Sequence, residues 1–168
     1  FTIIDNEEVT ERAKKIAEIA NATFSTDRGS VKIIHPGEAE AIAACLVYEA
    51  KTLVIDERTT RYLIEAPQKI RKRLQRKLKR NVSIDKEKLK LLQTALKEIQ
   101  PIRSTELLTI AYEKGLLDFY EYANIEKRKH FKKEILEGAL WALKDSGCAI
   151  IGDEIKNIVA LQRTKREK

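Results

Sequence analysis

The sequence predicts an α/β domain with a mainly parallel sheet. Short apolar runs at residues 1–4, 31–34 and 52–55 have the length and composition of β-strands. Longer segments lie between them, in which apolar residues recur every three or four positions, as they do along one face of a helix. Strands that alternate with helices are typical of a three-layer fold, in which helices cover both faces of the sheet.

The first 64 residues contain the clearest alternation. Residues 21–30 are rich in Asn, Ser, Asp and Gly, which predicts a loop before the strand at 31–34. The next helix begins near Glu38. Residues 52–55 follow as a central strand, because they are almost entirely apolar. We expect the strands at 31–34 and 52–55 to be parallel neighbours in one sheet.

An inserted basic helical hairpin is expected at residues 65–99. Pro67 begins a helix with a narrow apolar seam, and a second helix with a similar seam runs from about residue 85 to residue 99. An edge strand near residue 100 and three helices then complete the chain. The α/β domain is therefore expected to comprise residues 1–64 and 100–165.

Positive charge is concentrated in the inserted segment. Residues 67–90 contain eleven Lys or Arg and two acidic residues, a net charge of +9, whereas the whole chain carries +7. A basic helix with so few acids favours binding to a polyanion such as RNA. The candidate contacts with the nucleic-acid backbone are Lys69, Arg71, Lys72, Arg73, Arg76, Lys77, Lys79 and Arg80.

Several classes of protein are disfavoured by what the sequence lacks. No apolar run is long enough for a membrane span, and the first residues do not resemble a signal peptide, so we expect a soluble, cytoplasmic protein. Cys45 and Cys148 lack metal-ligand spacing and are expected to be buried, reduced thiols. The chain starts with Phe instead of Met, which favours a missing upstream segment.

Two carboxylates could act at the edge of the predicted sheet. Asp56 follows the strand at 52–55, and Glu38 opens the preceding helix, so both should lie on the rim where α/β proteins bind ligands. Carboxylates that converge there could hold Mg²⁺ or Mn²⁺, which promotes phosphoryl displacement. Helix capping explains the same two positions equally well.

The segment GEAEAIAACLVYEAKTLVIDERTTRYL resembles PIN-domain proteins of an archaeal and bacterial subgroup. The upstream FTIIDNEEVTERAKKIAEIA resembles the strand and helix that precede it in that family. The segments IRSTELLTIAYEKGLL and LEGALWALKDSGCAIIGDEI resemble the closing strand and helix and the C-terminal extension of the subgroup. The resemblance implies a three-layer PIN-like fold and a metal-dependent ribonuclease that acts on single-stranded RNA.

The catalytic site implied by this resemblance is a quartet of acidic residues. Glu38 matches the third acid and Asp56 the fourth, and each would be both a catalytic residue and a metal ligand. The first two acids have no match, so we expect the N-terminal part of the domain to be missing or the protein to be catalytically silent.

Three functions are therefore consistent with the sequence. The first is a Mg²⁺- or Mn²⁺-dependent endoribonuclease of PIN type, whose basic hairpin binds the RNA backbone. The second is a silent nucleic-acid-binding protein on a PIN-like scaffold. The third is an interaction module that uses the hairpin to bind an acidic protein, and a homodimer is also open.

Overall fold

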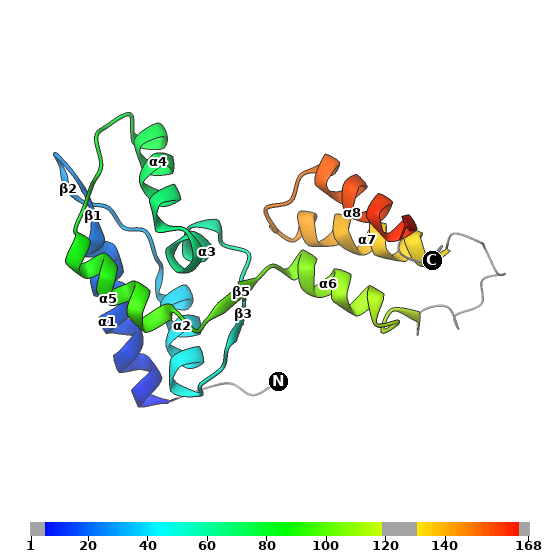
Figure 1. The fold of residues 1–168 in the computed structure, drawn as a ribbon, viewed down its shortest axis with the longest axis horizontal. Coiled ribbons are helices and arrows are strands. Elements are labelled where there is room, and N and C mark those ends of the chain that lie inside the picture. Colours follow the sequence, from blue (N-terminus) through cyan, green and yellow to red (C-terminus); the bar gives the residue numbers. More distant parts are fainter. Residues whose placement is uncertain (1–5, 119–130, 165–168) are drawn as a thin grey trace. The chain divides into compact units, whose positions relative to one another are not determined.

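The computed structural model describes residues 6–118 and 131–164, and the chain divides into two compact units (Figure 1). Unit 1 comprises Phe1–Pro101 and unit 2 comprises Ile102–Lys168. The prediction of a mixed α/β protein is confirmed, although helices predominate and the sheets are small. The strand expected at residues 1–4 lies outside the described residues.

Unit 1 is built from helices that surround a small amount of sheet. Its elements are α1 (Glu7–Thr23), β1 (Phe24–Thr26), β2 (Gly29–Ser30), α2 (Pro36–Val47), β3 (Thr52–Val54), α3 (Arg58–Glu65), α4 (Pro67–Leu78), β4 (Ser83–Ile84) and α5 (Lys86–Leu96), with β5 (Gln100–Ile102) at the boundary with unit 2.

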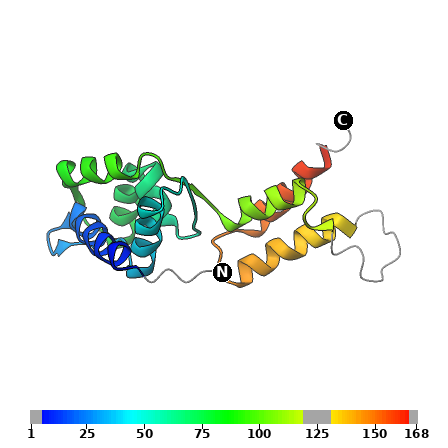
Figure 2. The same cartoon turned by 90° about the horizontal axis from the view of Figure 1, so that it is seen from below.

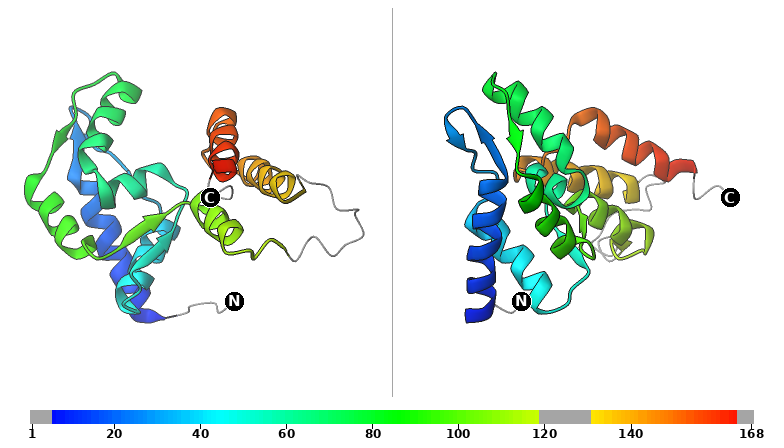
Figure 3. Two further views of the ribbon diagram at one scale, coloured as in Figure 1. Left: turned by 45° about the vertical axis from the view of Figure 1, so that its right-hand side comes forward. Right: turned by 60° about the vertical axis from the view of Figure 1, so that its left-hand side comes forward.

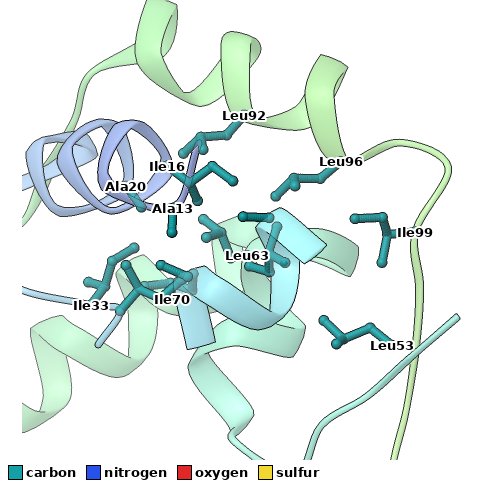
Figure 4. Close-up of a cluster of buried hydrophobic side chains, with 14 of the residues drawn as sticks. Ala13, Ile16, Ala20, Ile33, Leu53, Leu63, Ile70, Leu92, Leu96 and Ile99 are labelled. Atoms are coloured by element: carbon teal, nitrogen blue, oxygen red, sulfur yellow. The ribbon is translucent and has the colours of Figure 1, made fainter. Parts of the chain in front are cut away.

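A single hydrophobic core holds the helices of unit 1 together. α1 packs against α2 and α5, and its apolar stripe buries Ala13, Ile16 and Ala20 (Figure 4). Leu63 of α3 and Ile70 of α4 belong to the same cluster and are almost inaccessible to solvent. Burial of side chains of this size contributes roughly 1.5 to 3 kcal/mol each, so this core dominates the stability of unit 1.

A three-stranded antiparallel sheet with the order β2-β1-β4 replaces the loop predicted at residues 21–30. Phe24 of β1 is fully buried and anchors the hairpin to the core. Gly29 has a φ of +108°, a value that only glycine adopts readily, and lies at the turn between β1 and β2. The polar composition that suggested a loop therefore belongs to a hairpin with one buried face.

The strand predicted at residues 31–34 is not formed. The Asn21 side chain hydrogen-bonds this segment in place of a neighbouring strand: its Oδ1 accepts from the N–H groups of Ile33 (2.7 Å) and Ile34 (3.0 Å), and its Nδ2 donates to the Ile34 carbonyl (3.2 Å). Ile33 and Ile34 are buried, so their apolar character reflects core packing. The apolar composition of residues 31–34 predicts a strand, but it results from burial in the core.

The strand predicted at residues 52–55 exists, but its neighbour and its position differ from the prediction. β3 pairs in parallel with β5, not with residues 31–34, and the Gln100 N–H donates to the Lys51 carbonyl at 2.7 Å. Only Leu53 of β3 is buried, and Val54 is 46% exposed. β3 is therefore half of a two-stranded sheet with one exposed face.

The two helices predicted within residues 65–99 are present as α4 and α5, but their packing differs from the expected hairpin. α4 packs mainly against α3, whereas α5 packs against α1, and β4 between them pairs with β1. Leu92 and Leu96 of α5 join the core around α1. That residues 1–64 and 100–165 form one PIN-like domain stays a prediction.

Unit 2 contains α6 (Ser104–Glu113), α7 (Phe131–Asp145) and α8 (Gly152–Thr164). α7 packs against both α6 and α8 (Figure 2). The core of the unit is formed by Tyr112, Leu136, Leu140, Cys148, Ile150, Ile155 and Val159. Both Cys45 in unit 1 and Cys148 are buried, free thiols, as predicted. Among the described residues, no helix has the length and apolar character needed to cross a bilayer.

Candidate nucleic-acid interface

α4 attaches to unit 1 through a narrow apolar face and exposes the rest of its surface. Ile70 and Leu74 are buried, Leu78 is half-buried, and Pro67 occupies the first helical turn, where its missing N–H is tolerated. The exposed positions between Ile70 and Leu78 all carry Lys or Arg. α4 is therefore held by one side and presents a basic face on the others.

Three of the eight predicted contact residues have partners within the chain. The Lys69 ammonium lies over the Tyr62 ring at 5.4 Å from its centroid, and the Arg71 Nε donates to the Val82 carbonyl at 2.9 Å. Arg80 forms an ion pair with Asp27 in the turn between β1 and β2. These three side chains therefore make contacts within the folded protein.

The other five residues form the exposed basic surface of α4. None of them makes an ion pair within residues 6–118 and 131–164, and all five are exposed: Lys72, Arg73, Arg76, Lys77 and Lys79. Like charges one helical turn apart repel one another, although Arg76 and Lys77 gain from the negative end of the helix dipole. The arrangement can bind several phosphate groups without displacing an existing acidic partner.

Lys79 ends α4 in a left-handed conformation. Its φ and ψ are 54° and 37°, values that favour glycine at the end of a helix. A lysine at this position costs about 1 kcal/mol of backbone strain. The strained residue carries one of the exposed charges of the basic surface.

Glu38 is half-buried in the first turn of α2, where its carboxylate caps the helix. Its Oε2 accepts a hydrogen bond from the His35 N–H at 2.8 Å. Glu106 does the same in α6, where its Oε2 accepts from the Arg103 N–H at 2.8 Å. Helix capping is therefore sufficient to explain the position of Glu38, and its catalytic role stays a prediction.

Asp56 is half-buried directly after β3. α2 and β3 run in opposite directions, so the start of α2 with Glu38 and the end of β3 with Asp56 lie at the same end of this pair (Figures 1 and 3). The part of the chain that the structure describes contains no group of three or more His, Cys, Asp or Glu residues that could hold a metal ion. The described residues therefore do not fit a complete Mg²⁺ or Mn²⁺ site.

Glu57, next to Asp56, caps α3. Its carboxylate accepts from the Thr60 N–H at 2.6 Å. Burial alone would raise the pKa of Glu57, but hydrogen bonds from Thr59 and Thr60 outweigh it and lower the pKa below its ordinary value. Glu57 is thus held ionised by the start of α3, which makes it a capping residue.

The contribution of the β1–β2 turn was not predicted from the sequence. Asp27 and Arg80 are 53 positions apart and give no local pattern. Their ion pair places this turn beside the C-terminal end of α4, and both lie at the same end of unit 1 in Figures 1 and 3. Arg28 in the turn is therefore a neighbour of the basic surface.

Comparison with known proteins gives no relative from which a function could be transferred. No protein-family model, curated protein or solved structure matches the chain.

Proposed function

We propose that this protein binds single-stranded RNA through the basic surface of α4. The observation that supports the proposal is that five Lys or Arg residues of this surface are exposed and that none of the five makes an ion pair within the described residues. Elsewhere in unit 1 some basic residues pair with acids, as Arg12 does with Glu8 (3.2 Å) and Lys88 with Asp85 (2.5 Å), whereas exposed residues such as Lys14 and Lys90 make no ion pair within the described residues. α4 differs because its basic residues lie together on one helix that contains no acidic residue. The unneutralised charge of α4 is best relieved by phosphates.

Binding of this kind has a characteristic dependence on salt. Each phosphate that pairs with a Lys or Arg releases condensed counterions, so the logarithm of the affinity falls by roughly 0.7 per contact for each logarithmic unit of salt on a single strand. The number of contacts is thus measurable from the slope, and the contacts on α4 can be removed without touching Ile70 and Leu74 of its buried face.

The test is the replacement of four residues of this surface, Lys72→Gln, Arg73→Gln, Arg76→Gln and Lys77→Gln, in one variant. We expect the affinity for a single-stranded RNA at about 0.05 M salt to fall more than tenfold, and the salt slope to fall by up to about 3. Fluorescence anisotropy across a salt series measures both quantities. The midpoint of urea unfolding should change little, because all four side chains are exposed.

A matched control separates the position of the charges from their number. Replacing the exposed residues Lys14, Lys86, Lys90 and Lys156 by Gln removes the same charge from other helices. We expect this variant to keep most of the affinity and the slope. If the two variants lose affinity equally, binding is a consequence of net charge alone and α4 is not the site.

A PIN-type, metal-dependent endoribonuclease is the second candidate function. It is favoured by the parallel pairing of β3 with β5, because β3 lies in the first segment that resembles the family and β5 ends at Ile102, where the segment that resembles the closing strand and helix begins. This candidate function includes the prediction of a three-layer PIN-like domain. Because the described residues do not complete a metal site, catalysis would require acidic residues from outside them.

RNA cleavage by Asp56→Asn and Glu38→Gln variants tests the second candidate, with Glu106→Gln as the control. Glu38 and Glu106 cap their helices in the same way, so their replacement by Gln should lower stability similarly, by about 0.5 to 1 kcal/mol. A nuclease would show Mg²⁺- or Mn²⁺-dependent cleavage that is lost with Asp56→Asn and Glu38→Gln and kept with Glu106→Gln. Equal cleavage by all variants, or none by the unmodified chain, would argue against it.

A further inference from the structure

Two side-chain contacts join the three-stranded sheet to α4 and to Arg80, which follows α4 closely. β4 follows α4 after a short turn, and the Arg71 Nε donates to the Val82 carbonyl just before β4 begins (2.9 Å). The ion pair between Arg80 and Asp27 joins the β1–β2 turn to the end of the same helix. The sheet and α4 are thus fastened together at two points.

The β1–β2 turn adds a free cation to this region. Asp27 is the only acidic residue of β1, β2 and the turn between them, and Arg80 neutralises it. Arg28 is exposed and makes no ion pair with any residue of the described part of the chain. Its guanidinium can therefore donate to a phosphate group without competition from a neighbouring carboxylate.

Three serines lie in one row across the sheet. Ser25 of β1 is in register with Ser30 of β2 on one side and with Ser83 of β4 on the other. Phe24, the preceding residue, points into the core, so Ser25 and its two register partners occupy the opposite, outer face. Ser30 and Ser83 are exposed and Ser25 is half-exposed.

The hydrogen bonds within this row use the hydroxyl protons of Ser25 and Ser83 and leave that of Ser30 for a ligand. The Ser83 hydroxyl lies 3.0 Å from the Ser25 hydroxyl and donates to the Ser25 carbonyl at 3.2 Å. Because the Ser83 proton is donated to the Ser25 carbonyl, the bond between the two hydroxyl groups uses the Ser25 proton, which Ser25 donates to the Ser83 oxygen. The Ser30 hydroxyl is exposed beside Ser25.

We infer that a single-stranded RNA bound to α4 continues onto this sheet, where Arg28 and the hydroxyl group of Ser30 donate to its phosphate oxygens. The inference rests on the proposed function, since it extends the same surface. Arg28 supplies charge in the β1–β2 turn, and Ser30, which follows it on β2, supplies a neutral donor. Arg80 acts as a positioning residue, because its ion pair with Asp27 holds the turn in place.

Two variants test the inference by their different effects on the salt dependence. Arg28→Gln should weaken binding to single-stranded RNA about threefold or more and lower the salt slope by about 0.7. The serine variant Ser30→Ala should weaken binding about two- to tenfold with an unchanged slope, since a hydroxyl group releases no counterions. Lys90→Gln and Ser146→Ala, at exposed positions on α5 and after α7, are the controls and should leave affinity unchanged.

The outcomes distinguish this inference from the proposed function. If the α4 variant loses binding while Arg28→Gln and the serine variant bind like their controls, the sheet does not contact RNA and the α4 site stands. If the α4 variant also binds normally, both proposals fail. Circular dichroism checks that the serine variant is folded, and Arg28→Gln, which changes only an exposed side chain, provides the answer independently if the serine variant is not.

Discussion

Arg103 in unit 2 and the arginines of α4 in unit 1 use the same side chain in opposite ways. Arg103 is only 13% exposed and forms an ion pair with Glu154, and its Nη2 donates to the Ala149 carbonyl at 2.8 Å. Burial alone would lower the pKa of Arg103, but the Glu154 carboxylate raises it above its ordinary value. Arg73 and Arg76 of α4 are exposed and have no acidic partner within the described residues.

The difference shows which charges the fold requires. A buried cation is stable only when acceptors surround it, so the sequence of unit 2 must provide Glu154 and a free carbonyl. An exposed cation is stabilised by water alone and needs no partner, so its presence says nothing about the fold. The twelve residues of α4 include exposed cations and no acidic residue. Binding of a ligand explains this composition better than the needs of folding do.

The largest effect is expected from Arg103→Ala. The substitution leaves the Glu154 carboxylate and the Ala149 carbonyl without their partner and should destabilise unit 2 by about 2 kcal/mol, less than for a fully buried pair because Glu154 is 37% exposed. Trp141, the only tryptophan of the chain, lies in unit 2 and reports its unfolding by fluorescence. RNA affinity should be unchanged.

Lys156→Ala is the control for this prediction. Lys156 is an exposed cation of the same unit, so its loss should change stability by less than about 0.5 kcal/mol. If Arg103→Ala were as mild as Lys156→Ala, or if it weakened RNA binding, the distinction between cations that serve the fold and cations that serve a ligand would not hold.

Helices were predicted well from the sequence, because their apolar period depends only on neighbouring residues. α2 and α4 appear where the spacing of Ala39, Ile42 and Ala43, and of Ile70 and Leu74, places them. The excess of basic residues on α4 was also predictable, since a narrow seam cannot hide them. Five of the eight predicted residues are exposed and make no ion pair, side-chain hydrogen bond or ring contact with the described residues.

Strand pairing was predicted poorly, because it depends on residues far apart in the sequence. Ile33 and Ile34 have the composition of a strand, yet Asn21 satisfies their backbone hydrogen bonds from the end of α1. The same holds for the site. The contact of Asp27 with Arg80 and the capping role of Glu38 depend on where the backbone places these side chains, which composition and spacing do not reveal.

Lys79→Gly is expected to have an intermediate effect: it should increase the stability of unit 1 and weaken RNA binding. Glycine removes the strain of the left-handed conformation and should stabilise unit 1 by about 0.5 to 1 kcal/mol, while the loss of one cation should lower the salt slope of RNA binding by about 0.7. Glu49→Gly is the matched control, because Glu49 has a similar φ of 53° but carries a negative charge away from α4. It should stabilise the unit without weakening binding.

Urea unfolding followed by circular dichroism and RNA titration measure the two effects of Lys79→Gly separately. A gain in stability with unchanged RNA affinity would remove Lys79 from the binding surface. A loss of stability would show that the lysine side chain contributes to the fold, contrary to its assignment among the exposed cations.

The smallest effect is expected from Glu57, which caps α3, and this effect depends on pH. The pKa of Glu57 in the folded protein lies below its ordinary value of 4.5, so its ionised form stabilises α3 above that pH and this contribution is lost as pH falls through the folded-state pKa. Glu57→Gln should therefore cost about 0.5 kcal/mol near neutral pH and progressively less between about pH 5 and about pH 3. Urea unfolding at several pH values, with the exposed Glu40→Gln as control, measures this difference. A cost that does not vary with pH would mean that the ionised Glu57 accepts the hydrogen bond from the Thr60 N–H no better than the protonated Glu57 does, and that the charge of Glu57, like those of the α4 cations, is not needed by the fold.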